Sequence, residues 1–273
     1  MTTTAESPDT GSASAAPRAD CIADSAGGVT FDITGAGRPG AALVLRRRGA
    51  KPGPDVLLPL TPAAEGVLRA VLPSTVELAE GEWETYLRAG EGEERRLEPG
   101  VRDLRALVDR EPGPDTDGVA VRIPYPGRSG ELVVRSWLRK PHAETGEVGF
   151  GADAVTVRGR LYGTGLAPDA VVEARLRGGA GRTHRVPATA DADGFTFTLP
   201  YGPLAEGLDA KEWLWDLWLL TGDATIRLAR ILDDVPLKQV IFVYPGTRVG
   251  PGVVRPYYTG ANDLSVRVDR AAG

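Results

Sequence analysis

A polar, aromatic segment near the C-terminus carries the side chains best suited to hold a ligand. Arg255 is followed by Tyr257 and Tyr258. Asn262 lies a few residues further along the chain. A guanidinium group binds carboxylates and phosphates through two parallel hydrogen bonds, and tyrosine and asparagine add hydroxyl and amide groups. We therefore expect a loop from Arg255 to Asn262 that binds a sugar, a phosphate group or a partner. The alternative is structural, because such a tyrosine also anchors a sandwich corner to the backbone.

Tryptophans are concentrated in one short run that contains Trp213, Trp215 and Trp218. An exposed aromatic platform can stack on sugar rings, so Trp213 and Trp218 are candidate ligand-binding residues. Trp83 and Trp215 share a local pattern of Trp, acid, any residue, Tyr or Trp, and Leu. A tryptophan at the same place in two similar segments is typical of a sandwich core. We therefore expect Trp83 and Trp215 to be buried.

The sequence contains no nucleophile elbow, Walker loop or dinucleotide-binding fingerprint. Asp233 and Asp234 are adjacent acids, but neighbouring residues of a strand point to opposite faces, so we expect a turn there. The two histidines, His142 and His184, and the single cysteine, Cys21, are too few for a metal site built on those residue types. We predict no catalytic residue, no metal ligand and no cofactor.

Composition favours a β-rich globular protein. The 273 residues include 35 glycines and 22 prolines, which punctuate turns and interrupt helices. A hydrophobic content of 42% with 25% charged residues is ordinary for a chain with a real core. The net charge of -5 predicts no general attraction to nucleic acid or to anionic membranes. Nearly all basic residues are arginine, which is typical of a high-GC genome such as an actinobacterial one.

The local pattern is that of antiparallel strands. Residues 29–33, 155–161 and 264–268 alternate apolar and polar side chains, which places one face on a core and the other in water. Residues 101–108 and 225–232 are further candidates, and we favour strands over a helix for both. The runs are separated by turn signals at residues 36–40, 51–55, 111–115 and 191–194.

An internal repeat is the most informative feature of the sequence. Four segments recur in the same order, with spacings that drift by a few residues. The repeat predicts an all-β protein with two tandem antiparallel β-sandwich domains of immunoglobulin-like type, produced by internal duplication. The matched pairs are Gly66–Pro73 with Gly194–Pro200, Trp83 with Trp215, Tyr125–Arg128 with Tyr244–Thr247, and Val133–Arg135 with Val253–Arg255.

The expected organisation is a tail, two domains and a linker. Residues 1–26 are rich in Ser, Thr, Ala and Pro and contain no apolar run, so we expect a disordered tail rather than a signal peptide or membrane anchor. The two sandwich repeats should span residues 27–140 and 150–270. Residues 141–149 should link them. The cytoplasm is the expected location, without membrane insertion.

The repeated segments, together with residues 230–235 and 255–266, resemble actinobacterial β-rich accessory regions of cell-wall glycopolymer transferases. These enzymes include teichoic-acid-type glycosyltransferases and glycerophosphotransferases. The resemblance spans roughly residues 28–268, and it implies tandem β-sandwiches that help assembly or polymer binding. In that family a separate nucleotide-sugar domain carries catalysis, and nothing in this sequence resembles that domain.

Three functions follow as alternatives. The favoured one is a non-catalytic module that binds a partner protein, such as a glycosyltransferase, or a glycan. The second is a genuine transferase with its site in the second repeat. The third is a structural module for homo-oligomerisation. Sugar binding requires exposed aromatic rings in a groove, catalysis requires convergent carboxylates, and oligomerisation requires an apolar patch or an open sheet edge.

Overall fold

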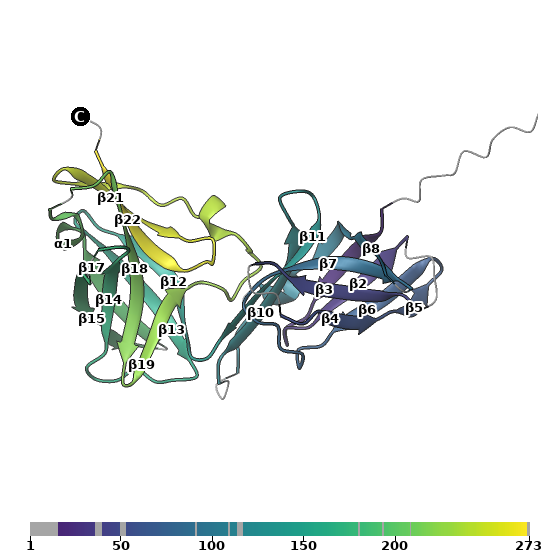
Figure 1. The fold of residues 1–273 in the computed structure, drawn as a ribbon. Helices are drawn as coiled ribbons and strands as arrows, with labels where there is room; N and C mark the ends of the chain where they lie inside the picture. The colour runs from purple at the N-terminus through teal and green to yellow at the C-terminus, as the bar shows by residue number, and fades with distance from the viewer. Residues whose placement is uncertain are drawn as a thin grey trace, which may run out of the picture.

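The computed structural model describes residues 16–35, 40–49, 53–90, 92–108, 110–113, 117–179, 181–192, 194–207 and 209–271. Within these ranges the regular secondary structure is almost entirely β-strand, which confirms the all-β prediction. Figure 1 shows two halves side by side, the first drawn in purple to teal and the second in green to yellow. The predicted turns at 36–40, 51–55, 111–115 and 191–194 lie partly outside the described residues, and so does most of the predicted tail.

The first half consists of a five-stranded sheet with the order β5-β6-β2-β1-β9 and a six-stranded sheet. The six-stranded sheet has the order β10-β11-β7-β3-β4, and β8 pairs with β7. The elements of the first half are β1 Arg18–Ala23, β2 Val29–Thr34, β3 Ala42–Arg47, β4 Val56–Pro59, β5 Thr61–Ala64, β6 Val67–Leu72, β7 Gly81–Ala89, β8 Glu93–Arg96, β9 Glu98–Asp103, the 3-10 turn η1 Arg105–Leu107, β10 Val119–Pro126 and β11 Leu132–Arg139.

The second half forms an eleven-stranded sheet. Its main path runs β16-β17-β13-β12-β19-β18-β22-β21-β20, and β14 pairs with β15 and β18. Its elements are β12 His142–Phe150, β13 Ala154–Tyr162, β14 Val171–Leu176, β15 Thr183–Pro187, β16 Thr189–Asp191, β17 Gly194–Pro200, the short helix α1 Gly202–Ala205, β18 Glu212–Thr221, β19 Ala224–Ala229, the 3-10 turn η2 Lys238–Val240, β20 Thr247–Val249, β21 Gly252–Tyr258 and β22 Leu264–Arg270.

Strand pairing repeats between the halves. Trp83 in β7 lies opposite Val134 of β11, and Trp215 in β18 lies opposite Val266 of β22. Both tryptophans are buried, as the sequence predicted. The same strand order therefore holds a tryptophan at the same place in each core.

The hairpins that follow β10 and β21 also match. In the hairpins 127–131 and 259–263, the first residue donates its N–H to the carbonyl of the last, at 2.7 and 2.9 Å. The fourth residue takes a left-handed backbone in both, with φ 82° at Gly130 and 61° at Asn262. Glycine and asparagine are the residues that tolerate this conformation best.

This register corrects part of the predicted repeat. Because β11 corresponds to β22, the structural counterpart of Val133–Arg135 is Ser265–Arg267 rather than Val253–Arg255. The counterpart of the segment from Arg255 to Asn262 is likewise 123–130. The two Val-Val-Arg segments lie in β11 and β21, which occupy different places in the strand order.

Two predicted boundaries also differ from the structure. The strand β1 lies inside the predicted tail 1–26, where Ala19 and Cys21 face the first core and Ala23 faces the apolar cluster between the halves. The predicted linker 141–149 is occupied by β12, which pairs with β13 and β19. The sequence did not predict these strands, because the buried residues of β1 are small and β12 is mostly polar.

The two segments predicted as matching strands diverge. Residues 224–229 form β19 as expected. In the first half β9 ends at Asp103 and is followed by η1, so 101–108 is only partly a strand. The strand β19 reaches from β18 to β12, which joins the second half into one sheet. In the first half two separate strands make the equivalent pairings: β8 pairs with β7, and β9 pairs with β1.

A small apolar cluster joins the halves. It contains side chains of β1, η1, β10 and β11 from the first half and of β19 and the residues after it from the second. Trp137 is fully buried there, and its indole N–H donates to the carbonyl of Ala261 at 2.9 Å. Arg139 extends the contact, since it bonds Glu80 at 2.7 Å and lies 2.8 Å from Asp263. The junction is a packed interface.

Candidate functional site

The predicted loop from Arg255 to Asn262 is mostly strand. Arg255, Tyr257 and Tyr258 belong to β21, and Asn262 lies in the turn that follows. Tyr258 is fully buried, where its hydroxyl lies 3.1 Å from that of Thr145, and burial raises the pKa of this phenol. Arg255 is exposed, and Tyr257 is half-buried. The structure therefore brings only Arg255 and Tyr257 of this group to the surface.

Asn262 is a buried structural residue. Its side-chain oxygen accepts the backbone N–H of Lys238 at 3.0 Å, and its amide donates to the carbonyl of Val235 at 3.1 Å. These bonds fasten the segment 232–242 to the hairpin 259–263. An asparagine that combines a left-handed backbone with two such bonds cannot be freed for a ligand without releasing that segment.

The two candidate tryptophans have guanidinium groups over their rings. Trp213 is only 9% exposed, and the guanidinium carbon of Arg182 lies 4.5 Å from its ring centroid. Trp218 is half-buried between Arg175 and Arg227, at 4.9 and 5.4 Å. A sugar ring would have to displace an arginine to stack on either indole.

The environment of Trp218 recurs in the first half, which sequence reasoning did not reveal. Tyr86 in β7 has Arg46 of β3 and Arg96 of β8 over its ring, at 5.1 and 5.8 Å. The equivalent strands β14 and β19 supply the arginines around Trp218. In each half the aromatic ring and its two arginines belong to three different strands. This shared arrangement can therefore be recognised only once the strand pairing is known.

An acid accompanies each of these rings. Glu84 accepts a hydrogen bond from Arg48 at 2.9 Å, and Asp216 accepts one from Arg177 at 2.6 Å. Partial burial acts to raise the pKa of both carboxyls, but the surrounding arginines outweigh it and hold both below their ordinary values. The charges are satisfied within the sheet, so these clusters stabilise the sheet faces and leave no free acid.

The segment between β19 and β20 is held by a buried ion pair. Lys238 is fully buried, and its ammonium group donates to Asp233 at 2.5 Å and to the carbonyl of Val235 at 3.1 Å. Asp233 also accepts from Arg230 and from the N–H of Val235. Burial lowers the pKa of Lys238, and the charge of Asp233 opposes that shift. The predicted turn at Asp233 is thus an anchor for the residues that follow.

Those residues expose an apolar surface. Val240, Ile241 and Val243 are 70%, 63% and 80% exposed. Between them, Phe242 packs on the buried Tyr258 with ring centroids 5.8 Å apart. We call Val240, Ile241 and Val243 the apolar strip. Figure 1 shows this yellow-green segment, with the turn η2, extending from the second half toward the junction.

Aromatic contacts fix the far end of the strip. Tyr244 lies 6.2 Å from Phe242 and 5.0 Å from Phe150 of β12, measured between ring centroids. Phe150 is itself 39% exposed and widens the apolar surface. The sequence carries a signal for this feature, because residues 240–244 form an unbroken apolar run without the alternation of a half-buried strand.

A cleft of about 310 Å³ lies at the junction beside the strip. Within it Glu82 forms an ion pair with Arg48 and accepts a hydrogen bond from the hydroxyl of Tyr125, both at 2.8 Å. Arg128 and Gln239 are exposed and have no hydrogen-bond partner among the described residues. The lining residues are Arg48, Glu82, Tyr125, Pro126, Gly127, Arg128, Leu237 and Gln239.

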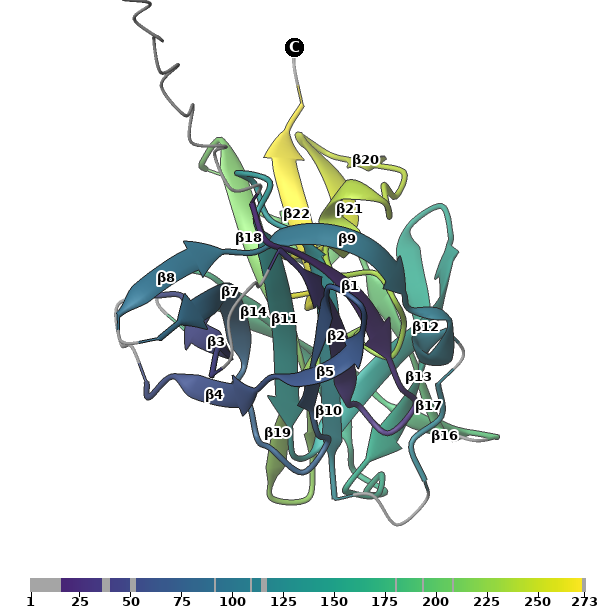
Figure 2. The ribbon, with the colours of Figure 1, turned by 90° about the vertical axis from the view of Figure 1, so that its right-hand side faces the viewer.

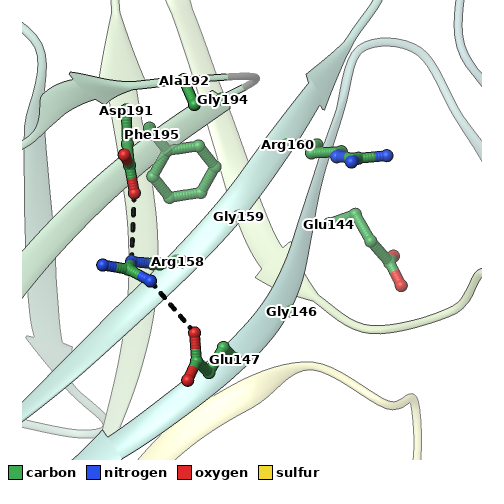
Figure 3. Close-up of a pocket in the computed structure, with 10 residues that line it drawn as sticks. All are labelled: Glu144, Gly146, Glu147, Arg158, Gly159, Arg160, Asp191, Ala192, Gly194 and Phe195. Carbon is green, nitrogen blue, oxygen red and sulfur yellow. Dashed lines mark hydrogen bonds and ion pairs between the residues drawn. The ribbon is translucent and has the colours of Figure 1, made fainter.

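A second groove, also of about 310 Å³, lies on β12, β13 and β17 (Figure 3). Arg158 bonds Glu147 at 3.2 Å and Asp191 at 3.1 Å, as the dashed lines show. Glu144 points away from these groups, and it accepts the N–H groups of Ile231 and Leu232 as well as a bond from His142. The carboxylates of this groove are thus paired with other protein groups, and they do not point toward one common position.

The acidic, histidine and cysteine side chains of the described residues are dispersed. No set of three or more His, Cys, Asp or Glu side chains in this part of the chain is placed to hold a metal ion. None of the helices among them is long and apolar enough to span a membrane. Asp233 and Asp234 carry no shared site, because Asp233 is committed to Lys238 and Arg230.

No protein-family model matches the chain, and no curated protein matches it in sequence. Among solved structures it is distantly similar to Staphylococcus aureus TarS, with a TM-score of 0.37 and 15% identity over 51% of this chain. That match covers 26% of TarS, so the chain spans about a quarter of it. A similarity this distant assigns neither a family nor a function to the chain.

Two further solved structures are more distant. A pullulanase from Anoxybacillus sp. LM18-11 complexed with maltotriose gives a TM-score of 0.24 and 11% identity, over 76% of this chain and 24% of that one. The complex of Dpr11 IG1 with DIP-gamma IG+IG2 gives 0.20 and 9% identity, over 78% of this chain and 97% of that one. Both are weak similarities.

Proposed function

We propose that this chain is a non-catalytic module that binds a protein partner through the apolar strip. The observation that carries the proposal is the exposure of Val240, Ile241 and Val243 in a segment whose backbone is anchored. Contiguous exposed apolar side chains mark interaction surfaces in soluble proteins. Burying an aliphatic side chain contributes roughly 1.5–3 kcal/mol, so three of them supply the centre of an interface.

Anchoring makes the strip an efficient binding surface. Lys238, Asp233 and Asn262 fix the segment before any partner arrives. Binding to a segment already held in its bound conformation avoids the entropic cost of ordering it. In this proposal the role of the buried ion pair between Lys238 and Asp233 is to hold the strip in the conformation that the partner binds.

The state of the acids supports a non-catalytic role. Glu82 lines the junction cleft, Glu144, Glu147 and Asp191 line the second groove, and Asp233 lies near the strip. Each of these acids is hydrogen-bonded to or ion-paired with a protein group. A catalytic acid or base must reach the proton it transfers, and these carboxylates are occupied. The proposal therefore favours binding over a transferase in the second half.

The proposal is tested by quantitative affinity capture from the producing cell. Val243→Asp should reduce capture of the specific partner at least tenfold, because a carboxylate would be buried in an apolar contact. Val71→Asp is the matched control, since Val71 is a half-exposed valine of β6 far from the strip in the chain. Equal capture by both variants and the unmodified chain would remove the basis for the proposal.

A second candidate function is favoured by the junction cleft. Arg128 and Gln239 are exposed polar groups beside a tyrosine, which suits a hydroxyl-rich or phosphorylated oligosaccharide such as a fragment of a glycopolymer. Titration calorimetry with neutral and phosphorylated oligosaccharides checks this. Binding lost in Arg128→Ala but kept in Arg158→Ala would support it, and no heat with any sugar would exclude it.

We also propose that the halves arose by duplication and that the partner belongs to cell-envelope glycopolymer synthesis. The repeated strand order and matching hairpins support the first statement. The sequence resemblance of the repeated segments supports the second. The identity of the captured partner tests it, because a partner from unrelated metabolism would contradict it.

A further inference from the structure

The strand β20 is an open sheet edge beside the apolar strip. It pairs with β21 on one side, and no described strand pairs with its other side. Figure 2 places it at the outer margin of the second half. Unpaired N–H and C=O groups along such an edge are matched by the backbone of an added strand. A lipid surface offers no equivalent partner for them.

Two exposed arginines lie at or next to this edge. Arg248 lies opposite Val253, so it shares the outer face of the sheet with Arg255 two residues further along β21. Both arginines are exposed, and neither forms an ion pair with a described residue. Across the sheet from Arg255 is Arg267, whose charge is satisfied by Glu212 and Asp269.

The apolar strip lies toward the opposite face. Phe242 and Tyr244 of the same segment pack on Tyr258, and Tyr258 faces the core. Alternate side chains of an added strand would therefore meet two surfaces, the arginines on one face and apolar side chains on the other.

We propose that the partner segment is an extended, acidic strand of another protein, with alternating acidic and apolar residues, that pairs with the open edge of β20. This rests on the proposed function of the strip. Carboxylates on one face pair with Arg248 and Arg255, and apolar side chains on the other contact the strip. A second copy of this chain fits poorly, because its edge would bring Arg248 and Arg255 against their own copies.

Fluorescence anisotropy with labelled ten-residue peptides tests the proposal. The probes alternate valine with glutamate, glutamine or lysine. We expect the glutamate peptide to bind at least tenfold more tightly than the glutamine peptide, and the lysine peptide not to bind. In the double variant Arg248→Glu, Arg255→Glu this order should invert, so that the lysine peptide is rescued. Arg102→Glu, a reversal at an exposed arginine of β9 in the first half, should leave the order unchanged.

Hydrogen exchange provides a second readout. The glutamate peptide should protect the amides of β20, while binding elsewhere would leave them unprotected. Val243→Asp should weaken every peptide that binds. If it does so while the charge reversals change nothing, the strip binds protein but the acidic chemistry is wrong. If neither substitution changes binding, both this inference and the proposed function fail.

Three other outcomes would overturn the inference. Failure of every peptide to bind at millimolar concentration would exclude an acidic added strand. A dimer in sedimentation that Val243→Asp dissociates would make a second copy the occupant. Binding to phosphatidylglycerol vesicles that depends on Val243 would make the surface a membrane contact.

Discussion

At the scale of single residues, Lys238 and Asp233 decide whether the apolar strip stays in place. Asp233→Asn leaves a buried ammonium group without its carboxylate, so the free energy of unfolding should fall by about 3 kcal/mol. Adding Lys238→Met to that variant removes the orphaned charge and should restore most of the loss. Urea denaturation at neutral pH measures both. A change below about 0.5 kcal/mol in Asp233→Asn would mean that the pair does not anchor the segment.

Glu84 and Asp216 make the free energy of unfolding depend on pH in the acidic range. Their pKa values in the folded chain lie below the ordinary values of 4.5 and 3.8, because neighbouring arginines outweigh partial burial. Their contribution is complete at neutral pH. As the pH falls below those ordinary values, the unfolded chain takes up protons first and the contribution is progressively lost.

Denaturation midpoints measured from pH 7 to pH 3 check this dependence. The double variant Glu84→Gln, Asp216→Asn should start less stable at pH 7 and decline less steeply. Parallel curves for the two proteins would show that other carboxyls carry the acid sensitivity.

At the scale of elements, the matched hairpins separate backbone geometry from anchoring. Gly130→Asn should leave stability nearly unchanged, because asparagine tolerates the left-handed backbone. Asn262→Gly keeps that backbone but removes two bonds to the segment 232–242. Amide hydrogen exchange in that segment should therefore accelerate at least tenfold in Asn262→Gly alone. Equal acceleration in both variants, or none in Asn262→Gly, would contradict this assignment.

The same elements show what a sequence can predict. Alternation identified strands such as β13 and β22, and the shared Trp pattern located β7 and β18 in register, because these features follow from one strand at a time. The partners of each strand were harder to predict. The segment Val253–Arg255 resembles part of β11 in sequence, but the strand that corresponds to β11 by pairing is β22. The sequence of one strand does not specify which other strand pairs with it.

The candidate site was predicted only in part for the same reason. Arg255 is exposed, because its side chain lies on the outer face of β21. Tyr258 and Asn262 are buried, since the segment 232–242 folds over them and no local pattern announces that contact. The apolar run at 240–244 was visible in the sequence, but its exposure depends on the anchor at Lys238.

At the scale of the whole molecule, the junction should make the two halves unfold together. Trp137 is buried in the cluster that both halves share. Trp137→Ala should cost about 3–5 kcal/mol and uncouple them. Differential scanning calorimetry should show one transition for the unmodified chain and two for the variant. Two transitions in the unmodified chain would mean that the interface does not couple the halves.

The central claim is that the strip is where the partner docks, and site-resolved photo-crosslinking in the producing cell tests it most directly. A benzophenone amino acid at position 241 should form a single prominent adduct with one protein. The same group at position 71, on the exposed face of β6, should form none. Adducts of equal yield at both positions, or no adduct at position 241, would contradict the account.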